Sequence, residues 1–197
     1  MSNISMTTSK RNAIVTVMLI SAFVSMLNQT ILNTALPAII KGLNITETTA
    51  QWLITGFMLV NGIMIPLTAF LMDKYSTRHL YIFSMAIFLI GSVVAAVSPT
   101  FSILMISRII QAIGAGILLP LMQFTVFTLF PAEQRGFAMG LAGVVVQSAP
   151  AIGPTLTGLF VDLFSWRMPF YLVSAIAAVA FILGFFFVEN NTKTKDI

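Results

Sequence analysis

The chain has 197 residues, of which 58% are hydrophobic and only 8% are charged. An ordinary soluble domain carries about 25% charged residues, so this composition excludes a water-soluble globule and makes the lipid bilayer the solvent. The net charge of +4 is scattered singly between apolar runs, whereas a nucleic-acid-binding protein gathers basic residues on one face. We therefore expect a membrane protein with no nucleic-acid partner.

Six apolar stretches are long enough to cross the bilayer. Within hydrocarbon every backbone N–H and C=O must be paired inside the protein, which leaves helices or closed barrels. A spanning helix needs roughly 20 apolar residues, and long apolar runs favour helices over the short alternating segments of a barrel. We predict an all-α membrane fold, a bundle of six transmembrane helices at about 13–36, 51–72, 80–98, 101–129, 137–161 and 168–188.

The segments outside the spans are short. Residues 1–12 are expected to be a cytoplasmic N-terminal tail, and residues 189–197 a cytoplasmic tail or the start of a linker to a missing second half. Lysine and arginine are enriched in cytoplasmic loops. A cytoplasmic N-terminus puts Lys10, Arg11, Lys74, Arg78, Arg135, Lys193 and Lys195 inside and leaves Lys41 and Arg167 outside. We therefore expect a multi-pass protein of the cell membrane with both termini in the cytoplasm.

Arg108 is the charged residue expected deep within a span. It lies about 12 Å from the outer end of its helix at 1.5 Å per residue, and a charge in hydrocarbon needs a partner or a water-filled cavity. Gln111 follows on the same helical face, and Asn28 and Gln29 in the first span reach a similar depth. We expect a direct or water-bridged contact between Asn28 and Arg108. The alternative is that Arg108 snorkels to the outer interface.

Acidic residues are missing from the interior of the spans. Asp73 and Asp162 lie near helix ends, and arginine stays protonated in proteins. If transport is proton-coupled, the titrating carboxylate is then expected in a segment outside this chain. The sequence also lacks cysteine, and its single histidine, His79, lies in a loop, so we expect neither a metal site nor a cofactor.

The fifth span is rich in glycine and proline. Small residues let membrane helices approach closely, and proline removes a backbone donor and bends a helix. Tight packing without a transport role is the alternative explanation. Small residues four apart occur at Gly136 and Gly140 and at Ala149 and Gly153, and the candidate functional residues are Pro150, Gly153, Pro154 and Gly158.

Several segments resemble the major facilitator superfamily, and within it the drug:proton antiporter subfamily of the EmrB/QacA type. Residues 27–37 read LNQTILNTALP, similar to the subfamily pattern LDxTIVNVALP, with Asn28 in place of aspartate. Residues 108–116 read RIIQAIGAG, similar to the RxxQGxGA pattern that the family links to proton coupling. Residues 149–158 read APAIGPTLTG, similar to the antiporter motif GPxxGG, and residues 165–167 match the start of SWRWxF.

The loop after the second span resembles an eroded form of another family motif. Residues 69–78 read AFLMDKYSTR against GxLxDRxGR[RK], which keeps Asp73, Lys74 and Arg78. A carboxylate at a helix C-terminus is unfavourable with respect to the helix dipole. We therefore expect Lys74, Arg78 or the N-terminus of another helix to hold Asp73, and in the family that helix belongs to the second half.

The resemblance implies an N-terminal six-helix half made of two inverted three-helix repeats, with substrate bound near the midplane between two halves. It implies efflux of a hydrophobic or cationic small molecule in exchange for protons, with a second half as partner. The residues expected in transport and coupling are Arg108, Gln111, Asn28, Asp73 and Arg78, and those expected to line a substrate cavity are Gln29, Asn33, Asn61 and Gln147.

Two other functions are alternatives to transport. An intramembrane enzyme needs a nucleophile and a base facing each other within the membrane, yet the sequence has no GxSG motif and its only histidine lies in a loop. A non-transporting half that acts as an assembly subunit is the alternative that the sequence leaves open.

Overall fold

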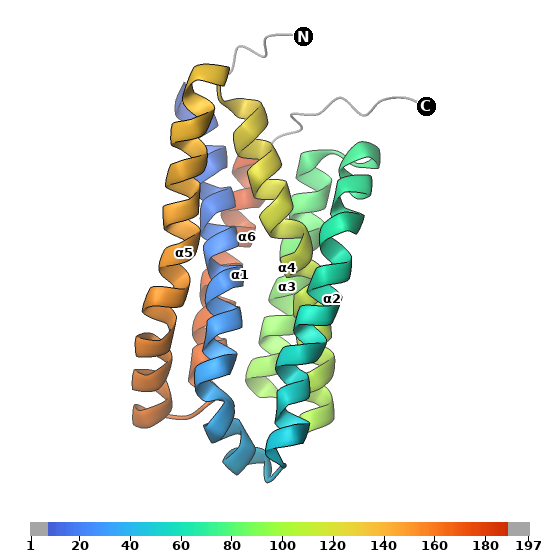
Figure 1. Ribbon diagram of the computed structural model, residues 1–197, viewed down its shortest axis with the longest axis vertical. Coiled ribbons are helices and arrows are strands. Elements are labelled where there is room, and N and C mark those ends of the chain that lie inside the picture. Colours follow the sequence, from blue (N-terminus) through green and yellow to red (C-terminus); the bar gives the residue numbers. More distant parts are fainter. Residues whose placement is uncertain (1–7, 189–197) are drawn as a thin grey trace.

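Long helices joined by short connections make up the structure, a computed structural model that describes residues 8–188 (Figure 1). Each helix is long and apolar enough to cross a membrane. The helices are α1 (Thr8–Leu43), α2 (Glu47–Lys74), α3 (Thr77–Val97), α4 (Phe101–Leu129), α5 (Ala132–Leu163) and α6 (Met168–Phe187). The prediction of a six-helix all-α membrane fold is therefore confirmed.

Several helices extend beyond the predicted spans. Residues 8–12, which belong to the predicted N-terminal tail, form the first turns of α1, and α1 continues through Pro37 to Leu43; the cytoplasmic location of the tail stays a prediction. Hydropathy detects the part of a helix that suits hydrocarbon, and polar residues can extend the same backbone hydrogen-bonding pattern into the headgroup region. Residues 1–7 and 189–197, with Lys193 and Lys195, lie outside the described residues.

Hydroxyl side chains begin three of the helices. An N-cap oxygen that accepts a hydrogen bond from a backbone N–H three residues later satisfies one of the free donors of the first turn. This arrangement fixes where the chain turns back into the membrane. The three pairs are Thr46 with the Thr49 N–H at 3.2 Å, Ser76 with the His79 N–H at 3.4 Å, and Thr100 with the Ile103 N–H at 3.4 Å.

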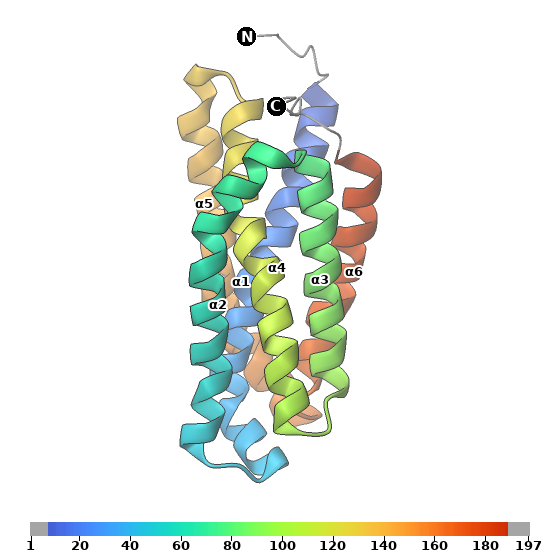
Figure 2. The ribbon, with the colours of Figure 1, turned by 90° about the vertical axis from the view of Figure 1, so that its right-hand side faces the viewer.

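The helices pack as two interleaved groups, with α1, α5 and α6 on one side and α2, α3 and α4 on the other (Figures 1 and 2). Helix α1 packs on α5 and α6, and α4 packs on α2 and α3. Exchanging α1 with α4, α2 with α5 and α3 with α6 leaves this pattern unchanged. The two repeats are α1–α3 and α4–α6. The second helix of each repeat packs on the first helix of the other, α5 on α1 and α2 on α4, and this leaves α1 and α4 at the centre.

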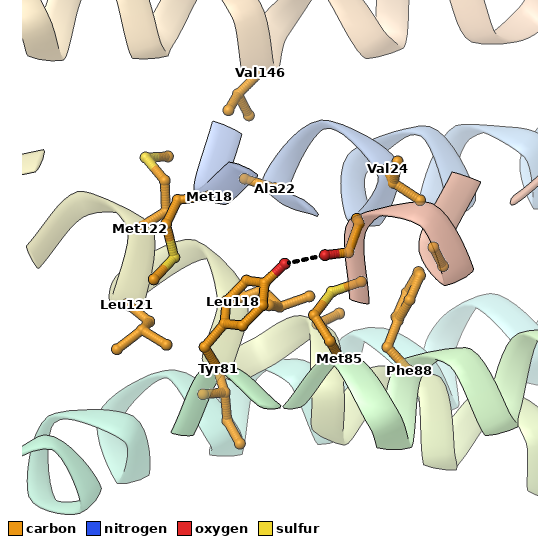
Figure 3. Packing of buried hydrophobic residues seen from close by; sticks show 14 of the residues in the cluster. Met18, Ala22, Val24, Tyr81, Met85, Phe88, Leu118, Leu121, Met122 and Val146 are labelled. Carbon is orange, nitrogen blue, oxygen red and sulfur yellow. Dashed lines mark hydrogen bonds between the residues drawn. The ribbon is translucent and has the colours of Figure 1, made fainter. Parts of the chain in front are cut away.

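Tyr81 connects three helices within the main apolar core (Figure 3). Its hydroxyl lies 2.9 Å from the carbonyl of Ala180 in α6 and 2.7 Å from the hydroxyl of Ser21 in α1. The Ser21 hydroxyl also lies 2.9 Å from the carbonyl of Val17 in its own helix. Each hydroxyl has one hydrogen, so two hydrogens serve these three contacts and either hydroxyl can donate to the other. The core therefore joins α3 to both α1 and α6 through one buried side chain.

Glycines bring α4 close to both of its neighbours. A methyl group at Gly114 would lie 2.9 Å from the backbone nitrogen of Phe88 in α3, and one at Gly116 would lie 3.2 Å from the carbonyl of Asn61 in α2. Neither backbone could accommodate a side chain at these distances. This close packing holds the middle of α4, about two turns after Arg108, between α2 and α3.

The two small-residue pairs of α5 differ in what they contact. Gly136 and Gly140 have open space around them, so the expectation that this pair packs closely is wrong within the described chain. Ala149 is buried, and a methyl group at Gly153 would overlap the Thr30 hydroxyl of α1. Spacing alone does not reveal which face of α5 meets α1, and only the second pair lies on that face.

Candidate functional site

Arg108 is buried in the interior of the bundle. Its side chain is 1% exposed, and its Nη1 donates to the Oε1 of Gln111 at 2.8 Å. The two residues are three apart on α4, a spacing that places side chains next to each other on one face. The alternative that Arg108 snorkels to the interface is therefore excluded.

Gln111 extends the polar cluster to two further helices. Its Nε2 donates to the hydroxyl of Ser92 in α3 at 3.0 Å and to the Oδ1 of Asn28 in α1 at 3.4 Å. The expected link between Asn28 and Arg108 is thus made through Gln111, which lies between them, and not by a direct hydrogen bond. Gly91 gives Gln111 this position, because a methyl group at Gly91 would lie 2.7 Å from the Gln111 Cγ.

An aromatic ring covers the charge from the side of α2. The guanidinium carbon of Arg108 lies 4.2 Å from the ring centroid of Phe57, which is itself 1% exposed. A cation over an aromatic face is stabilised by about 2 kcal/mol when the pair is desolvated. Phe57 therefore supplies part of the stabilisation that water would give an exposed arginine.

Three buried polar atoms of this region have no hydrogen-bond partner among residues 8–188. Two are donors, Arg108 Nε and Asn28 Nδ2, and one is an acceptor, Asn61 Oδ1. Acidic residues do not compensate the charge, because in the described chain each lies within two residues of a helix end. These are Glu47, Asp73, Glu133 and Asp162. The cluster is therefore positively charged and has free donors, a combination suited to an oxygen-bearing or anionic group.

Two small hollows adjoin on the side of α1 and α4. Gln29 and Asn61 line one of about 20 Å³, and Gln147 lines the other, of about 260 Å³, together with Gln123. Met26 and Leu119 line both. The residues expected to share a cavity thus come together in part. Asn33 is exposed and lines neither hollow, so its cavity role stays a prediction.

A third hollow, of about 620 Å³, lies away from this cluster. Its lining comes from the end of α2 and the start of α3 and is mainly apolar: Leu71, Tyr75, His79, Leu80 and Phe83. It contains no side chain of the Arg108 cluster. Its volume therefore says nothing about the candidate site.

The cations expected to hold Asp73 make other contacts. Lys74 lies over the ring of Phe70, 5.1 Å from its centroid. Arg78, in the first turn of α3, donates to the carbonyl of Phe185 in α6 at 3.1 Å. Asp73 is exposed at the end of α2, so the expected pairing with Lys74 or Arg78 is not made within the described part of the chain.

The fifth-span motif is positioned mainly through Gly153. Its backbone contacts Thr30 and Leu27 of α1, whereas Pro154 is exposed and Gly158 has open space around it. Pro150 lies within the helix and is partly buried. The motif therefore has one face on α1 and one face that this chain leaves uncovered.

Ser92 and Phe57 belong to the site but were not among the predicted residues. Ser92 is one of many serines in the spans, and Phe57 one of 17 phenylalanines. Neither has a sequence pattern that sets it apart. Gly91, directly before Ser92 and opposite Gln111, is a signal that could have pointed to close packing at this place.

Comparisons with known proteins agree with the helical arrangement. Residues 18–196 match the family described as Major Facilitator Superfamily. The chain is 51% identical over 185 residues to an uncharacterized MFS-type transporter, YcnB, of Bacillus subtilis, covering 94% of this chain and 39% of the relative. It is 40% identical over 177 residues to the lincomycin resistance protein LmrB of Bacillus subtilis, covering 90% of this chain and 37% of the relative.

A third relative carries a different substrate in its name. The riboflavin transporter RibZ of Clostridioides difficile is 34% identical over 183 residues, covering 90% of this chain and 40% of the relative. The chain thus spans little more than a third of the length of the curated relatives that it matches.

Proposed function

Because the chain belongs to the Major Facilitator Superfamily, we propose that it forms the N-terminal half of a secondary transporter that exports hydrophobic or cationic small molecules in exchange for protons. Relatives named as transporters place the chain among transporters and not among enzymes. A lincomycin resistance protein among them supports efflux. The observation that carries the proposal is the buried Arg108, held by Gln111 and Phe57 beside the hollow-lining face of α1 and α4.

Exposed polar side chains support a second half as partner. Asn33, Gln123 and Gln147 lie well inside α1, α4 and α5, yet they are exposed in this chain. Polar side chains at membrane depth face a bundle interior or a water-filled cavity and not lipid. A second half that packs over this face would enclose them, and it would also bring the proton-binding carboxylate that the described spans lack.

The charge distribution supports an orientation with the N-terminus in the cytoplasm. At the end of the bundle where α1 begins lie Lys10, Arg11, Lys74, Arg78 and Arg135, and at the other end lie Lys41 and Arg167. Short cytoplasmic loops carry the excess of basic residues. Single cysteines at Thr46 and Gln134, two exposed residues at opposite ends of the bundle, test it in this cysteine-free chain: only Thr46→Cys should react with a membrane-impermeant maleimide on intact cells.

Transport by the assembled protein is testable in proteoliposomes. Vesicles would be loaded with ethidium, a cationic dye, and efflux followed after a pH gradient is imposed. We expect no flux from the chain alone and flux when it is co-purified with the remaining part of the relative YcnB. Arg108→Gln should abolish that flux, whereas Lys41→Gln, a change at an exposed residue in the last turn of α1, should leave it unchanged.

The second candidate is a non-transporting assembly subunit. The two hollows on the side of α1 and α4, about 20 and 260 Å³, are smaller than the roughly 300–1,000 Å³ of a pocket for a drug-sized ligand. This observation favours a half that cannot transport by itself. The same assay separates the two functions, because dye efflux that remains absent with a second half in place supports the subunit and contradicts the exporter.

A further inference from the structure

Two arginines and two phenylalanines form a cluster at the end of the bundle where α1 and α5 begin. The guanidinium carbon of Arg11 lies 4.4 Å from the ring centroid of Phe130, in the connection between α4 and α5. Arg135 donates from Nε to the carbonyl of the same Phe130 at 3.1 Å and lies 4.3 Å from the ring centroid of Phe127. We call Arg11, Arg135, Phe127 and Phe130 the Arg11–Arg135 cluster.

The cluster offers guanidinium donors for an acceptor group. A guanidinium has five N–H donors in its own plane, and a ring stacked on its face leaves the edges of that plane free. Arg135 gives one donor to Phe130. The Nε of Arg11 is buried and has no hydrogen-bond partner among the described residues, and an unpaired buried donor costs about 1–3 kcal/mol. An acceptor from outside the chain would satisfy it.

An exposed aromatic side chain lies beside this cluster. Phe137, two residues after Arg135 in α5, is 78% exposed and is available to contact acyl chains. The arginines belong to the first turns of two helices that are long enough to span a membrane, and the end of such a helix lies in the headgroup region. Glu133, the acidic residue of this turn of α5, is exposed. The contacts of the two arginines are instead with the rings of Phe130 and Phe127 and with the Phe130 carbonyl.

We propose that the Arg11–Arg135 cluster binds the phosphate of an anionic phospholipid such as phosphatidylglycerol. Guanidinium groups bind phosphate oxygens in a bidentate manner, and basic side chains at the membrane surface attract anionic lipids. The exposed Phe137 would contact the acyl chains of the same lipid. The proposal needs only a membrane-embedded bundle and does not rest on transport or on its direction.

Native mass spectrometry of the full chain in detergent tests the proposal, with phosphatidylglycerol and phosphatidylcholine of identical acyl chains as probes. Each basic residue near the surface contributes about fivefold to anionic lipid affinity. Arg11→Gln and Arg135→Gln should therefore each weaken the first bound phosphatidylglycerol about fivefold and leave phosphatidylcholine binding unchanged. The control is Arg78→Gln, which removes a guanidinium that also donates to a carbonyl at the same end of the bundle. It should change the affinity less than twofold.

Three results would overturn the proposal. An equal loss in Arg78→Gln would mean diffuse attraction by the basic end of the bundle. Displacement of the lipid by glycerol 3-phosphate or inorganic phosphate at equal concentration would identify a site for soluble phosphate. If Arg11→Gln does not fold, Arg135→Gln and Arg11→Lys carry the test, since lysine keeps the charge and loses the planar donors. Unchanged phosphatidylglycerol affinity in both would then exclude the site.

Discussion

The guanidinium of Arg108 lies over the ring of Phe57, with 4.2 Å between the guanidinium carbon and the ring centroid. One face of the charge is therefore covered by α2, and one edge is bonded to Gln111 of its own helix at 2.8 Å. Because the side chain is 1% exposed, the protein itself replaces the hydration of this charge. The stability of the bundle should then depend on the residues that surround Arg108.

Replacing Gln111 with leucine should destabilise the bundle strongly. The substitution removes the side-chain acceptor for the buried Arg108 guanidinium, and losing a hydrogen bond to a charged group costs about 1.5–3 kcal/mol. The free energy of unfolding would be measured by SDS titration in mixed micelles. Gln123→Leu is the matched control, because Gln123 is an exposed glutamine on the same helix and its loss should leave the free energy nearly unchanged. Equal losses would argue against a special role for Gln111.

Coupling between Asn28 and Arg108 should depend on Gln111. Residues in one hydrogen-bond network have interaction energies of about 0.5–3 kcal/mol in double-mutant cycles. We expect a value in this range for Asn28→Ala combined with Arg108→Ala, measured on unfolding or on transport by the assembled protein. Repeating the cycle in a Gln111→Leu background should reduce it to zero. Coupling that persists there would indicate a path that bypasses Gln111, such as a bridging water.

Two glycines of the fifth-span motif should respond differently to alanine. A methyl group at Gly153 would overlap the Thr30 hydroxyl, whereas one at Gly158 meets no atom within 4 Å. Overpacking costs about 1–3 kcal/mol, so Gly153→Ala should lower the free energy of unfolding by this amount. Gly158→Ala should raise it slightly, because alanine favours the helix over glycine. A greater loss of unfolding free energy in Gly158→Ala than in Gly153→Ala would contradict the packing of α5 on α1.

The six helices could be predicted from sequence because the bilayer leaves few choices. Span length and the need to pair every backbone group determine the fold class before any contact is known. The burial of Arg108 follows from the same argument. The partners of Arg108 and Gln111 on other helices could not be predicted in this way, since nothing local distinguishes Ser92 or Phe57 from similar residues of the spans. The packing of α2 on α4 and of α5 on α1 is likewise a property of the assembled bundle.

Predictions based on loop charges were less successful. Lys74 and Arg78 flank Asp73 in sequence, but the rings of Phe70 and Phe185 lie near the two cations in the structure. Sequence proximity could not reveal this, because Arg78 belongs to the first turn of α3 and reaches α6. The likeness of the loop to a family motif does not define its contacts within this half.

Gly42→Ala should loosen the opposite end of the bundle. A methyl group there would lie 3.0 Å from the Trp166 Cδ1 and closer to its Nε1, and Trp166 is 6% exposed. We expect a loss of about 1–3 kcal/mol and a red shift of Trp166 fluorescence, measured in a Trp52→Phe background so that only Trp166 reports. Gly62→Ala, with no atom within 4 Å of the added methyl group, is the control. An unshifted spectrum in Gly42→Ala would contradict this contact.

The contact between Tyr81 and Gly184 should appear as compensation between two substitutions. A methyl group at Gly184 would overlap the Tyr81 ring and lie 2.7 Å from its hydroxyl oxygen, so Gly184→Ala alone should cost about 1–3 kcal/mol. Tyr81→Phe removes the hydroxyl that bonds to Ala180 and Ser21. It should cost only about 0.6 kcal/mol, the average for hydrogen bonds between membrane helices.

Tyr81→Phe should not rescue Gly184→Ala, because the ring carbons that the methyl group would meet are still present. Tyr81→Leu removes those carbons and leaves a space that the new methyl group can enter. We therefore expect Gly184→Ala to cost less in the Tyr81→Leu background than in the unchanged chain, by SDS titration of each single and double variant. Equal costs in both backgrounds would mean that α6 does not approach α3 at this point, and the joining of α1, α3 and α6 through Tyr81 would have to be abandoned.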